Sequence, residues 1–442
     1  MNELDRDLPE GFKITELGPL PEEWEVVRLG EVAEISSGGS APQGDEYFKG
    51  EKPFIRVSHI DNEDCVIKEY DLINDKAVQD YKLKLFPKGT IVFPKSGATI
   101  YLEKRAMLPT DAYVVSHLCT IIADEKNATQ DFLFYLLREL KLAKEKADGY
   151  PTLNISEIKQ IIFPLPPLPE QRKIAAVLSA VQEAKEKTEA VISAAQGLKK
   201  SMMNYLFTYG PVPVVDAENV PLKETEIGMI PEEWEVLRLG DYDLLKKAQY
   251  GLSIRGSKLG KYPILRMNNL INGAISTDDL QFVNLDESTF RRFKLEKGDI
   301  LFNRTNSFEL VGKTSVFTLN DDFVFASYLI RLRVNDSKIF PLLFNFYFNW
   351  DITQGRLKCL ATRGASQSNI SATKLKTFLI PLPPLPTQQK IASMLSAIDE
   401  KIEAEENKKK ALEDLFNTLL HNLMTARIRV NHLALDKAEL AM

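Results

Sequence analysis

One stretch of the sequence gathers polar side chains suited to reading the edges of nucleic-acid bases. "FNRTNSFELVGKTSVF" begins at Phe302 and carries Asn303, Arg304, Thr305, Asn306, Ser307 and Lys313. Asn and Gln can pair bidentately with adenine, Arg can pair with guanine, and Ser, Thr and Lys suit phosphate oxygens. "TRGASQSN" adds Arg363, Ser366, Gln367 and Asn369, and earlier segments add Tyr250, Ser253, Arg266 and Asn268. These segments predict a surface that contacts DNA.

The N-terminal half offers a comparable set in "SSGGS", "FPKSGATIYLEKR" and "GYPTLNIS". Its candidate residues are Ser37, Ser40, Arg56, Lys95, Ser96, Thr99, Tyr101, Arg105, Tyr150, Thr152 and Asn154. A polar loop that contains glycine is commonly only a solvated turn. The prediction therefore rests on the whole set, because comparable polar loops recur at aligned positions in the two halves.

Residues that could carry catalysis form no recognised site. "VGKT" at 311–314 is similar to part of a phosphate-binding loop, but that motif needs a Gly where Ser307 stands. Asp131, Glu139 and Lys141 follow the order of nuclease residues, yet they fall in a predicted helix and are interpreted as a solvated face. The histidines are scattered, at His59, His117, His421 and His432. We therefore predict no catalytic residue, no metal site and no bound cofactor in this chain.

Length and composition set the broad class. The 442 residues exceed the size at which one hydrophobic core stops growing, so two or more domains are expected. With a net charge of −6, a polyanion would be held by local basic patches or by a basic partner. The three cysteines are far apart and are predicted to be small buried apolar residues. No apolar run is long enough to cross a bilayer, and "MNELDRDLPEGF" does not resemble a signal peptide, which predicts a cytoplasmic protein.

An internal repeat explains why two sets of loops exist. "FKITELGPLPEEWEVVRLG" at Phe12 returns as "LKETEIGMIPEEWEVLRLG" at Leu222, and "FPLPPLPEQRKIAAVLSAV" at Phe163 returns as "IPLPPLPTQQKIASMLSAI" at Ile380. Between these landmarks the copies differ, and "EISSGGSAPQGDEYFKG" stands where the other copy has "LLKKAQYGLSIRGSKLGK". A fixed frame with divergent inserts predicts two modules that perform the same task on different targets.

Each copy is expected to be a mixed, β-rich globular domain that leads into a long helix. Short runs such as "KPFIRVSHI" and "GTIVFP" are typical of strands, and helical patterns cover 129–148 and 340–359. After each proline-rich segment, apolar residues alternate four and three apart, which predicts a coiled coil. Polar residues on the same seam are Lys185, Thr188, Lys199, Glu405 and Lys409. The predicted divisions are 1–168 (first domain), 169–208 (central helix), 209–385 (second domain), 386–426 (C-terminal helix) and 427–442 (tail).

The two long helices are expected to pack on each other. A helix of this kind spans about 55 Å, more than a small domain can cover. The predicted fold class is therefore α+β, with two duplicated β-rich domains joined by two antiparallel coiled-coil helices about a pseudo-twofold axis. The proline segments would fix the angle at which each helix leaves its domain. The alternative is two separate helical hairpins inside two cores.

These motifs carry a family resemblance. "IPEEWEVLRLG", the two "PLPPLP" segments and the "NIS" before each resemble the specificity subunit of type I restriction-modification systems, from about Phe12 to Thr425. The resemblance implies two target-recognition domains that each read half of a split DNA sequence, and helices that set the gap. It implies double-stranded DNA, two modification subunits and restriction subunits as partners. S-adenosylmethionine, ATP and Mg would be bound by those subunits.

The resemblance also implies that the near-identical helix starts dock the modification subunits. The residues concerned are Gln171, Lys173, Ile174 and Leu178, with Gln388, Lys390, Ile391 and Leu395 in the second copy. The alternative is that their identity only preserves the joint between domain and helix. Two other functions stay open from the sequence. One is a coiled-coil scaffold whose heads bind protein, and the other is a fused modification enzyme.

Overall fold

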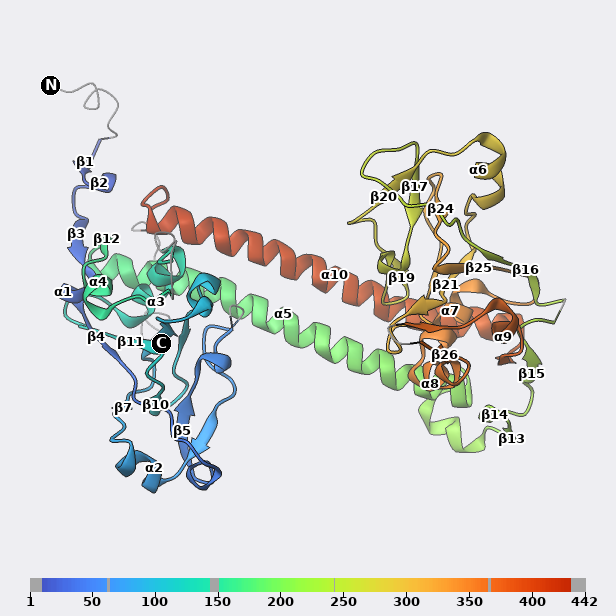
Figure 1. Cartoon of the computed structure of the whole chain (residues 1–442), viewed down its shortest axis with the longest axis horizontal. Helices are drawn as coiled ribbons and strands as arrows, with labels where there is room; N and C mark the ends of the chain where they lie inside the picture. Colours follow the sequence, from blue (N-terminus) through green and yellow to red (C-terminus); the bar gives the residue numbers. More distant parts are fainter. Residues whose placement is uncertain (1–9, 62–63, 144–150, 242, 365–366, 431–442) are drawn as a thin grey trace. The chain divides into compact units, whose positions relative to one another are not determined.

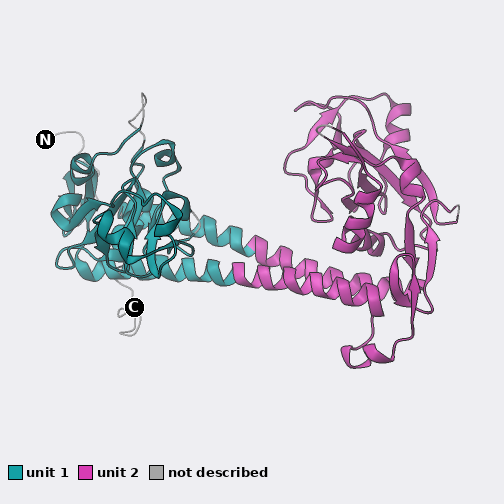
Figure 2. Cartoon of the chain, turned by 60° about the horizontal axis from the view of Figure 1, so that its bottom comes forward, with its two compact units in different colours: residues 1–188, 408–442 teal, residues 189–407 magenta. Residues whose placement is uncertain are grey.

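The computed structural model describes residues 10–61, 64–143, 151–241, 243–364 and 367–430. The chain divides into two compact units (Figure 2). Unit 1 comprises residues 1–188 and 408–442, and unit 2 comprises residues 189–407. Unit 2 is therefore continuous in sequence, whereas unit 1 is completed by the C-terminal segment.

Two four-stranded sheets lie in the described part of unit 1, and Figure 1 labels β4, β5, β7, β10 and β11 among their strands. The first is antiparallel, in the order β4 (Ala33–Ser37), β11 (Leu118–Ala123), β8 (Ile91–Pro94) and β9 (Ala106–Met107). The second contains a parallel pair, β5 with β10, in the order β6 (Asp71–Ile73), β5 (Lys52–Ile55), β10 (Ala112–Val114) and β7 (Leu85–Phe86). Alternate side chains of a strand point to opposite faces. In β8, Ile91 and Phe93 therefore enter one core and Val92 enters the other.

Short elements complete unit 1. They are the hairpin β1 (Phe12–Thr15) and β2 (Gly18–Pro21), the pair β3 (Glu25–Arg28) and β12 (Ile162–Leu165), and helices α1 (Leu29–Val32), α2 (Asp75–Asp80), α3 (Gln130–Glu139) and α4 (Ile155–Lys159). Thr129 caps α3, because its side chain accepts a hydrogen bond from the backbone N–H of Phe132. The helix ends at Glu139, so it is shorter than the predicted 129–148; residues 144–148 lie outside the described part of the chain.

Unit 2 repeats this plan. Its main sheet has the order β16 (Leu245–Tyr250), β25 (Leu329–Val334), β21 (Ile300–Asn303) and β23 (Thr314–Val316). A second sheet has the order β20 (Gln281–Val283), β17 (Tyr262–Leu265) and β24 (Val324–Phe325), beside the hairpin β18 (Leu270–Ile271) and β19 (Ala274–Ile275). The terminal pairs recur as β13 (Leu222–Thr225) with β14 (Gly228–Pro231) and β15 (Glu235–Arg238) with β28 (Leu379–Leu382). The predicted duplication of a β-rich mixed domain is thus confirmed.

The remaining elements of unit 2 surround the candidate loops. They are the small sheet β22 (Thr305–Asn306), β27 (Ser368–Asn369) and β26 (Thr362–Arg363), and helices α6 (Glu287–Phe293), α7 (Pro341–Asn349), α8 (Asp351–Cys359) and α9 (Ala372–Lys376). The predicted helix 340–359 is broken at Trp350, which has extended backbone angles. Its indole N–H donates to Asn204 Oδ1 (2.6 Å) and its ring packs on Phe207. A tertiary anchor therefore interrupts a continuous helical pattern.

Two long helices, α5 (Leu168–Tyr209) and α10 (Leu385–Met424), each contribute to both units. In unit 1, Lys185 pairs with Glu413 (3.7 Å); in unit 2, Lys199 pairs with Asp399 (2.5 Å). Residue numbers rise along one helix as they fall along the other, so the packing within each unit is antiparallel. The polar seam residues Lys185, Thr188 and Glu405 are buried, which confirms the predicted seam.

The boundaries between the two units fall inside the long helices, at 188/189 and 407/408. Each half-helix belongs to the unit whose core it covers. Ile174 and Leu178 join Phe416 and Leu423 in the core of unit 1. No helix among the described residues has both the length and the apolar character needed to span a bilayer.

The cysteines correct one prediction. Cys65 and Cys119 are buried, and burial raises their pKa values to about 11 and about 12. Cys359 is exposed at the end of α8, where its Sγ donates to the carbonyl of Gly355 (3.5 Å). The prediction of three buried cysteines is wrong for Cys359, because the last turn of α8 turns this position towards solvent.

Candidate nucleic-acid interface

In unit 2, the polar loop after β21 is held by backbone hydrogen bonds on both sides. The N–H of Arg304 donates to the carbonyl of Tyr328 (3.0 Å), and the N–H of Ile370 donates to the carbonyl of Arg304 (2.9 Å). Thr305 pairs with Asn369 in the small sheet. The structure thus brings together two segments that lie some sixty residues apart in sequence and that were both predicted to contact DNA.

Unit 1 holds its own loop with the same frame. The N–H of Lys95 donates to the carbonyl of His117 (2.9 Å), and the N–H of Leu153 donates to the carbonyl of Lys95 (2.7 Å). Ser96 and Thr152 form an antiparallel bridge. Lys95 is therefore the structural equivalent of Arg304, and Thr152 lies against the loop as Asn369 does in unit 2.

In each unit a third segment, the one that follows β4 in unit 1 and β16 in unit 2, is held by close contact between backbone atoms. A Cβ on Gly38 would lie 1.9 Å from the carbonyl oxygen of Val114, and one on Gly251 would lie 2.3 Å from that of Ala326. Only glycine fits at these two positions. The contact carries the chain from β4 towards Ser40 in unit 1, and from β16 towards Ser253 in unit 2. Both serines are exposed.

Arg304 is bound within its own unit. Its guanidinium donates to Asn369 Oδ1 (3.1 Å) and to the carbonyl of Ser327 (3.3 Å), and it lies 4.8 Å from the ring centroid of Tyr250. Asn369 in turn donates to Thr305 Oγ1 (2.7 Å). Arg304 therefore clamps the loop to β27, and direct base reading by its guanidinium stays a prediction.

The other predicted residues of unit 2 differ in exposure. Exposed residues are Tyr250, Ser253, Asn268, Arg363 and Gln367; half-buried ones are Arg266, Thr305, Asn306, Ser307, Lys313 and Asn369. Asn303 is buried, and its amide donates to the carbonyl of Leu310 (3.4 Å). Asp279 accepts hydrogen bonds from Arg266 (2.8 Å) and Asn268 (3.1 Å), so these two lie beside a carboxylate. Ser366 lies outside the described residues.

In unit 1, one predicted contact is corrected. Arg105 is 3% exposed, forms an ion pair with Glu103 and lies over the ring of Phe93 at 4.7 Å. It therefore cannot face DNA in this conformation, and burial lowers its pKa. Ser40, Tyr101 and Asn154 are exposed, whereas Ser37, Arg56, Lys95, Ser96, Thr99 and Thr152 are half-buried. Tyr150 lies outside the described residues.

Two of these residues in unit 1 have partners of their own. The guanidinium of Arg56 donates to Asp71 Oδ2 (2.5 Å). Asn154 is the N-cap of α4 and donates to the Glu157 carboxylate (3.2 Å). Both side chains would have to exchange these bonds for bonds to DNA.

The sequence analysis missed two aromatic residues. His117 and Tyr328 supply the carbonyls that hold Lys95 and Arg304, and both side chains are exposed. An exposed aromatic ring beside a polar loop can stack on a base or donate to its edge. The available signal was the repeated Ser-X-Leu pattern, "SHL" in one copy and "SYL" in the other.

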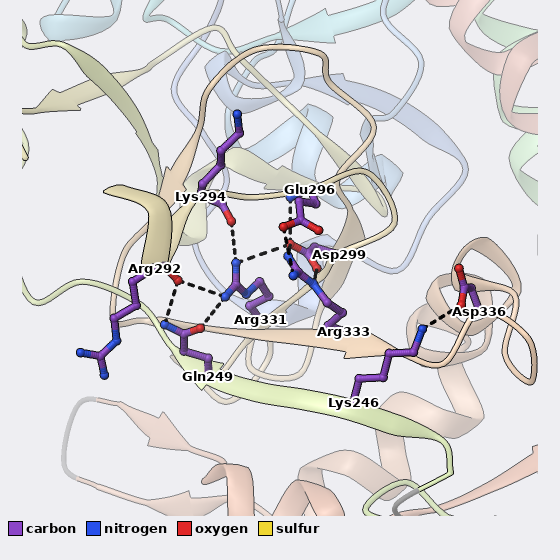
Figure 3. A network of polar contacts seen from close by, with 9 residues as sticks. All are labelled: Lys246, Gln249, Arg292, Lys294, Glu296, Asp299, Arg331, Arg333 and Asp336. Atoms are coloured by element: carbon purple, nitrogen blue, oxygen red, sulfur yellow. Dashed lines mark hydrogen bonds and ion pairs between the residues drawn. The ribbon is translucent and has the colours of Figure 1, made fainter. Parts of the chain in front are cut away.

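A buried ionic network joins the main sheet of unit 2 to the C-terminal end of α6 (Figure 3). Arg331, 2% exposed, donates to the carbonyl of Lys294 (2.6 Å) at the end of α6. Asp299 lies between Arg331 (3.6 Å) and Arg333 (2.7 Å), and its hydrogen bond raises the pKa of Arg333. In unit 1 a neutral pair, Ser36 and Thr120 (2.8 Å), occupies the corresponding strands.

The predicted docking residues lie mostly inside their own units. Gln171 is fully buried: its Oε1 accepts from the N–H of Thr129 (2.8 Å), and its Nε2 donates to the carbonyls of Asn127 (3.0 Å) and Pro166 (2.8 Å). Gln388 makes the same three bonds, with Phe340, Lys338 and Pro383 (2.8 Å each).

Aliphatic residues of the same set lie in the two cores, namely Ile174, Leu178, Ile391 and Leu395. Together with the two glutamines, they pack at the joint between domain and helix, and contact of this set with the modification subunits stays a prediction. Only Lys173 and Lys390 reach a surface. No group of three or more potential metal ligands occurs in the described ranges.

Comparisons with known proteins identify the family. A model of the type I restriction modification DNA specificity domain matches residues 21–194 and 231–414. The MjaVIII type I restriction enzyme specificity subunit of Methanocaldococcus jannaschii is 27% identical, over 96% of this chain and 97% of the relative. The EcoKI specificity subunit of Escherichia coli is 24% identical, over 88% and 86%. The crystal structure of a type I restriction-modification S subunit from M. genitalium shares the fold, with a TM-score of 0.58, 16% identity and coverage of 95% and 98%.

The two matches coincide with the two copies of the frame that holds Lys95 and Arg304. With both copies of the domain in place, the chain belongs to the family of DNA specificity subunits of type I restriction-modification systems.

Proposed function

We propose that units 1 and 2 each read one half of a split double-stranded DNA target, within a complex that also contains two modification subunits and restriction subunits. One observation carries the proposal. The same backbone hydrogen bonds hold the loops at Lys95 and Arg304, while the side chains on and around those loops differ. A constant frame with different polar groups suits two sites that read different bases.

In this proposal the chain supplies recognition, and its partners supply the chemistry. S-adenosylmethionine would be bound by the modification subunits, and ATP and Mg by the restriction subunits. The complex would act on cellular DNA in the cytoplasm. A basic partner would also supply phosphate contacts, which agrees with the net charge of −6 of this chain.

The long helices would set the gap between the two half-sites. Helix α5 continues without a break from residues of unit 1 to residues of unit 2, so its length constrains any target that both units bind. Lys173 and Lys390 occupy corresponding positions at the two helix starts. We therefore keep these two lysines as proposed contacts with the modification subunits.

Mapping of methylated adenine across the genome tests the proposal. Cells that carry this chain and its modification partner would be compared with cells that lack only this chain. The expected result is a split motif with a fixed gap that is methylated only when the chain is present. If an active partner gives no methylation that depends on the chain, the DNA-reading function is refuted, and a protein-binding scaffold becomes the better explanation.

A further inference from the structure

One arginine of unit 2 is stacked and has an open hydrogen-bonding edge. Arg363, at the end of β26, lies with its guanidinium carbon 3.9 Å from the ring centroid of Phe308. The residue is exposed. Within the described part of the chain, its guanidinium makes no hydrogen bond or ion pair. The aromatic ring therefore covers one face of the guanidinium and leaves its N–H edge to solvent.

Two other stacked arginines of unit 2, Arg304 and Arg356, have no such open edge. Arg304 over Tyr250 is held by Asn369 and Ser327. Arg356 over Phe378 donates to the Tyr347 hydroxyl (2.7 Å) and to the carbonyl of Leu379 (2.9 Å). These two arginines have hydrogen-bonding partners, whereas no described residue supplies one to the guanidinium of Arg363.

The strand pairing places Arg363 at the candidate interface. Arg363 lies opposite Ser368, and Ser368 lies opposite Asn306 on the next strand of the small sheet. Opposite residues in a sheet share a face, so Asn306 and Arg363 belong to one row. The stack is thus part of the same small sheet that Arg304 clamps.

The charged side chains near the stack, Lys358 and Glu309, do not form an ion pair with the guanidinium of Arg363. Lys358 lies 5.9 Å from the Phe308 ring and adds positive charge. The pKa of Glu309 is lowered mainly by hydrogen bonds from its own backbone N–H and from Ser307, and less by the charges of Lys358 and Arg363. Glu309 therefore interacts with Arg363 at a distance and forms no salt bridge with it.

We propose that Arg363 reads a guanine in the half-site of unit 2 and that Phe308 is the positioning residue that holds its guanidinium ready. Arginine recognises guanine by donating two hydrogen bonds from this edge to O6 and N7. A stacked side chain loses less rotamer freedom on binding than a free one. The inference rests on the proposed function, because it assigns one base contact within it.

Among the residues of unit 1 that the structure describes, the stack has no counterpart. The position that aligns with Phe308 is Thr99, whose hydroxyl donates to the carbonyl of Ser96 (3.4 Å). The guanine contact is therefore expected in one half-site only, and the half-site read by unit 1 serves as an internal control.

The test is the base preference of the methylated motif in cells that carry the chain and its partner. Arg363→Lys keeps the charge and loses the fork, so discrimination for guanine at one position should fall about 5- to 140-fold. Phe308→Ala should weaken discrimination at that same position, and Phe308→Tyr should restore it. Arg292→Lys is the matched control, because Arg292 is exposed and lies over Phe293 at 5.5 Å. It should leave the motif unchanged.

Each result decides between explanations. Uniformly reduced methylation with an unchanged motif in Arg363→Lys would overturn the inference and indicate a phosphate contact. Relaxation at different positions in the Arg363 and Phe308 variants would overturn the positioning role. Absence of a split motif with the wild-type chain would refute the proposed function itself, and the guanine contact with it.

Discussion

The buried glutamine at the start of α10 gives a prediction with a matched control, because the next residue is an exposed glutamine. Gln388 makes three hydrogen bonds to backbone groups, whereas the neighbouring Gln389 is exposed. Gln388→Leu removes three bonds of about 1 kcal/mol each and leaves the N–H of Phe340 without its partner. The expected loss in free energy of unfolding of unit 2 is about 3–5 kcal/mol. Gln389→Leu should change it by less than about 0.5 kcal/mol.

The assay is denaturant unfolding of the isolated chain, combined with hydrogen exchange at the Phe340 amide. In Gln388→Leu the midpoint should fall and the Phe340 amide should exchange faster, while the amide of Thr129 in unit 1 keeps its protection. If the isolated variant is as stable as the wild type but no longer binds the modification subunit, the reasoning is refuted. Gln388 would then be a docking residue, as the family resemblance implied.

Three further predictions test the ion pairs, the loop and the helices. The hydrogen bond from Arg429 lowers the pKa of Glu23 below its ordinary value of 4.5, so the stabilisation is present above that pH and is lost as pH falls through the lower folded value. Glu23→Gln should therefore flatten the acid side of the profile of unfolding free energy against pH, whereas Glu22→Gln, at the exposed neighbouring position, should leave it unchanged. Equilibrium unfolding at several pH values measures both effects. Arg304→Ala should reduce methylation about 10-fold or more through the half-site of unit 2 and leave the preference for the other half-site intact; unchanged methylation would count against the clamp. Deletion of one heptad from each long helix should shorten the gap in the methylated motif by about 3 base pairs, since seven residues span roughly 10.5 Å, and an unchanged gap would rule out the helices as the spacer.

Patterns that depend on periodicity were predictable from the sequence. The seam through Lys185 and Glu405 follows from the four-three alternation, and the duplicated frame follows from repeated segments. Pairings between distant residues were not predictable. Arg105 and Arg304 look alike as basic residues near glycine, yet one is buried over the ring of Phe93 and the other is clamped by Asn369. Their partners come from tertiary packing that no local pattern encodes.

The same limit applies to the glutamines and to Phe308. Gln171 and Gln388 stand in near-identical contexts, and the sequence alone could not separate a role in the joint from partner binding. A phenylalanine such as Phe308 is normally expected in a hydrophobic core, and only the structure places Arg363 on its ring. Local sequence therefore pointed to the loops but could not show which of their side chains are held by partners within the unit and which keep an open edge.

The division of the chain has a consequence for its synthesis on the ribosome. The core of unit 1 includes Phe416, Leu423 and Val430, so it cannot close until almost the whole chain has been translated. Unit 2 is continuous over residues 189–407 and can finish folding first, although most of unit 1 emerges before it. Until the last segment arrives, the apolar faces of α3 and of the first half of α5 stay uncovered. A nascent chain that stalls before residue 408 would therefore carry one finished module and one exposed core, which makes it a substrate for chaperones and proteases.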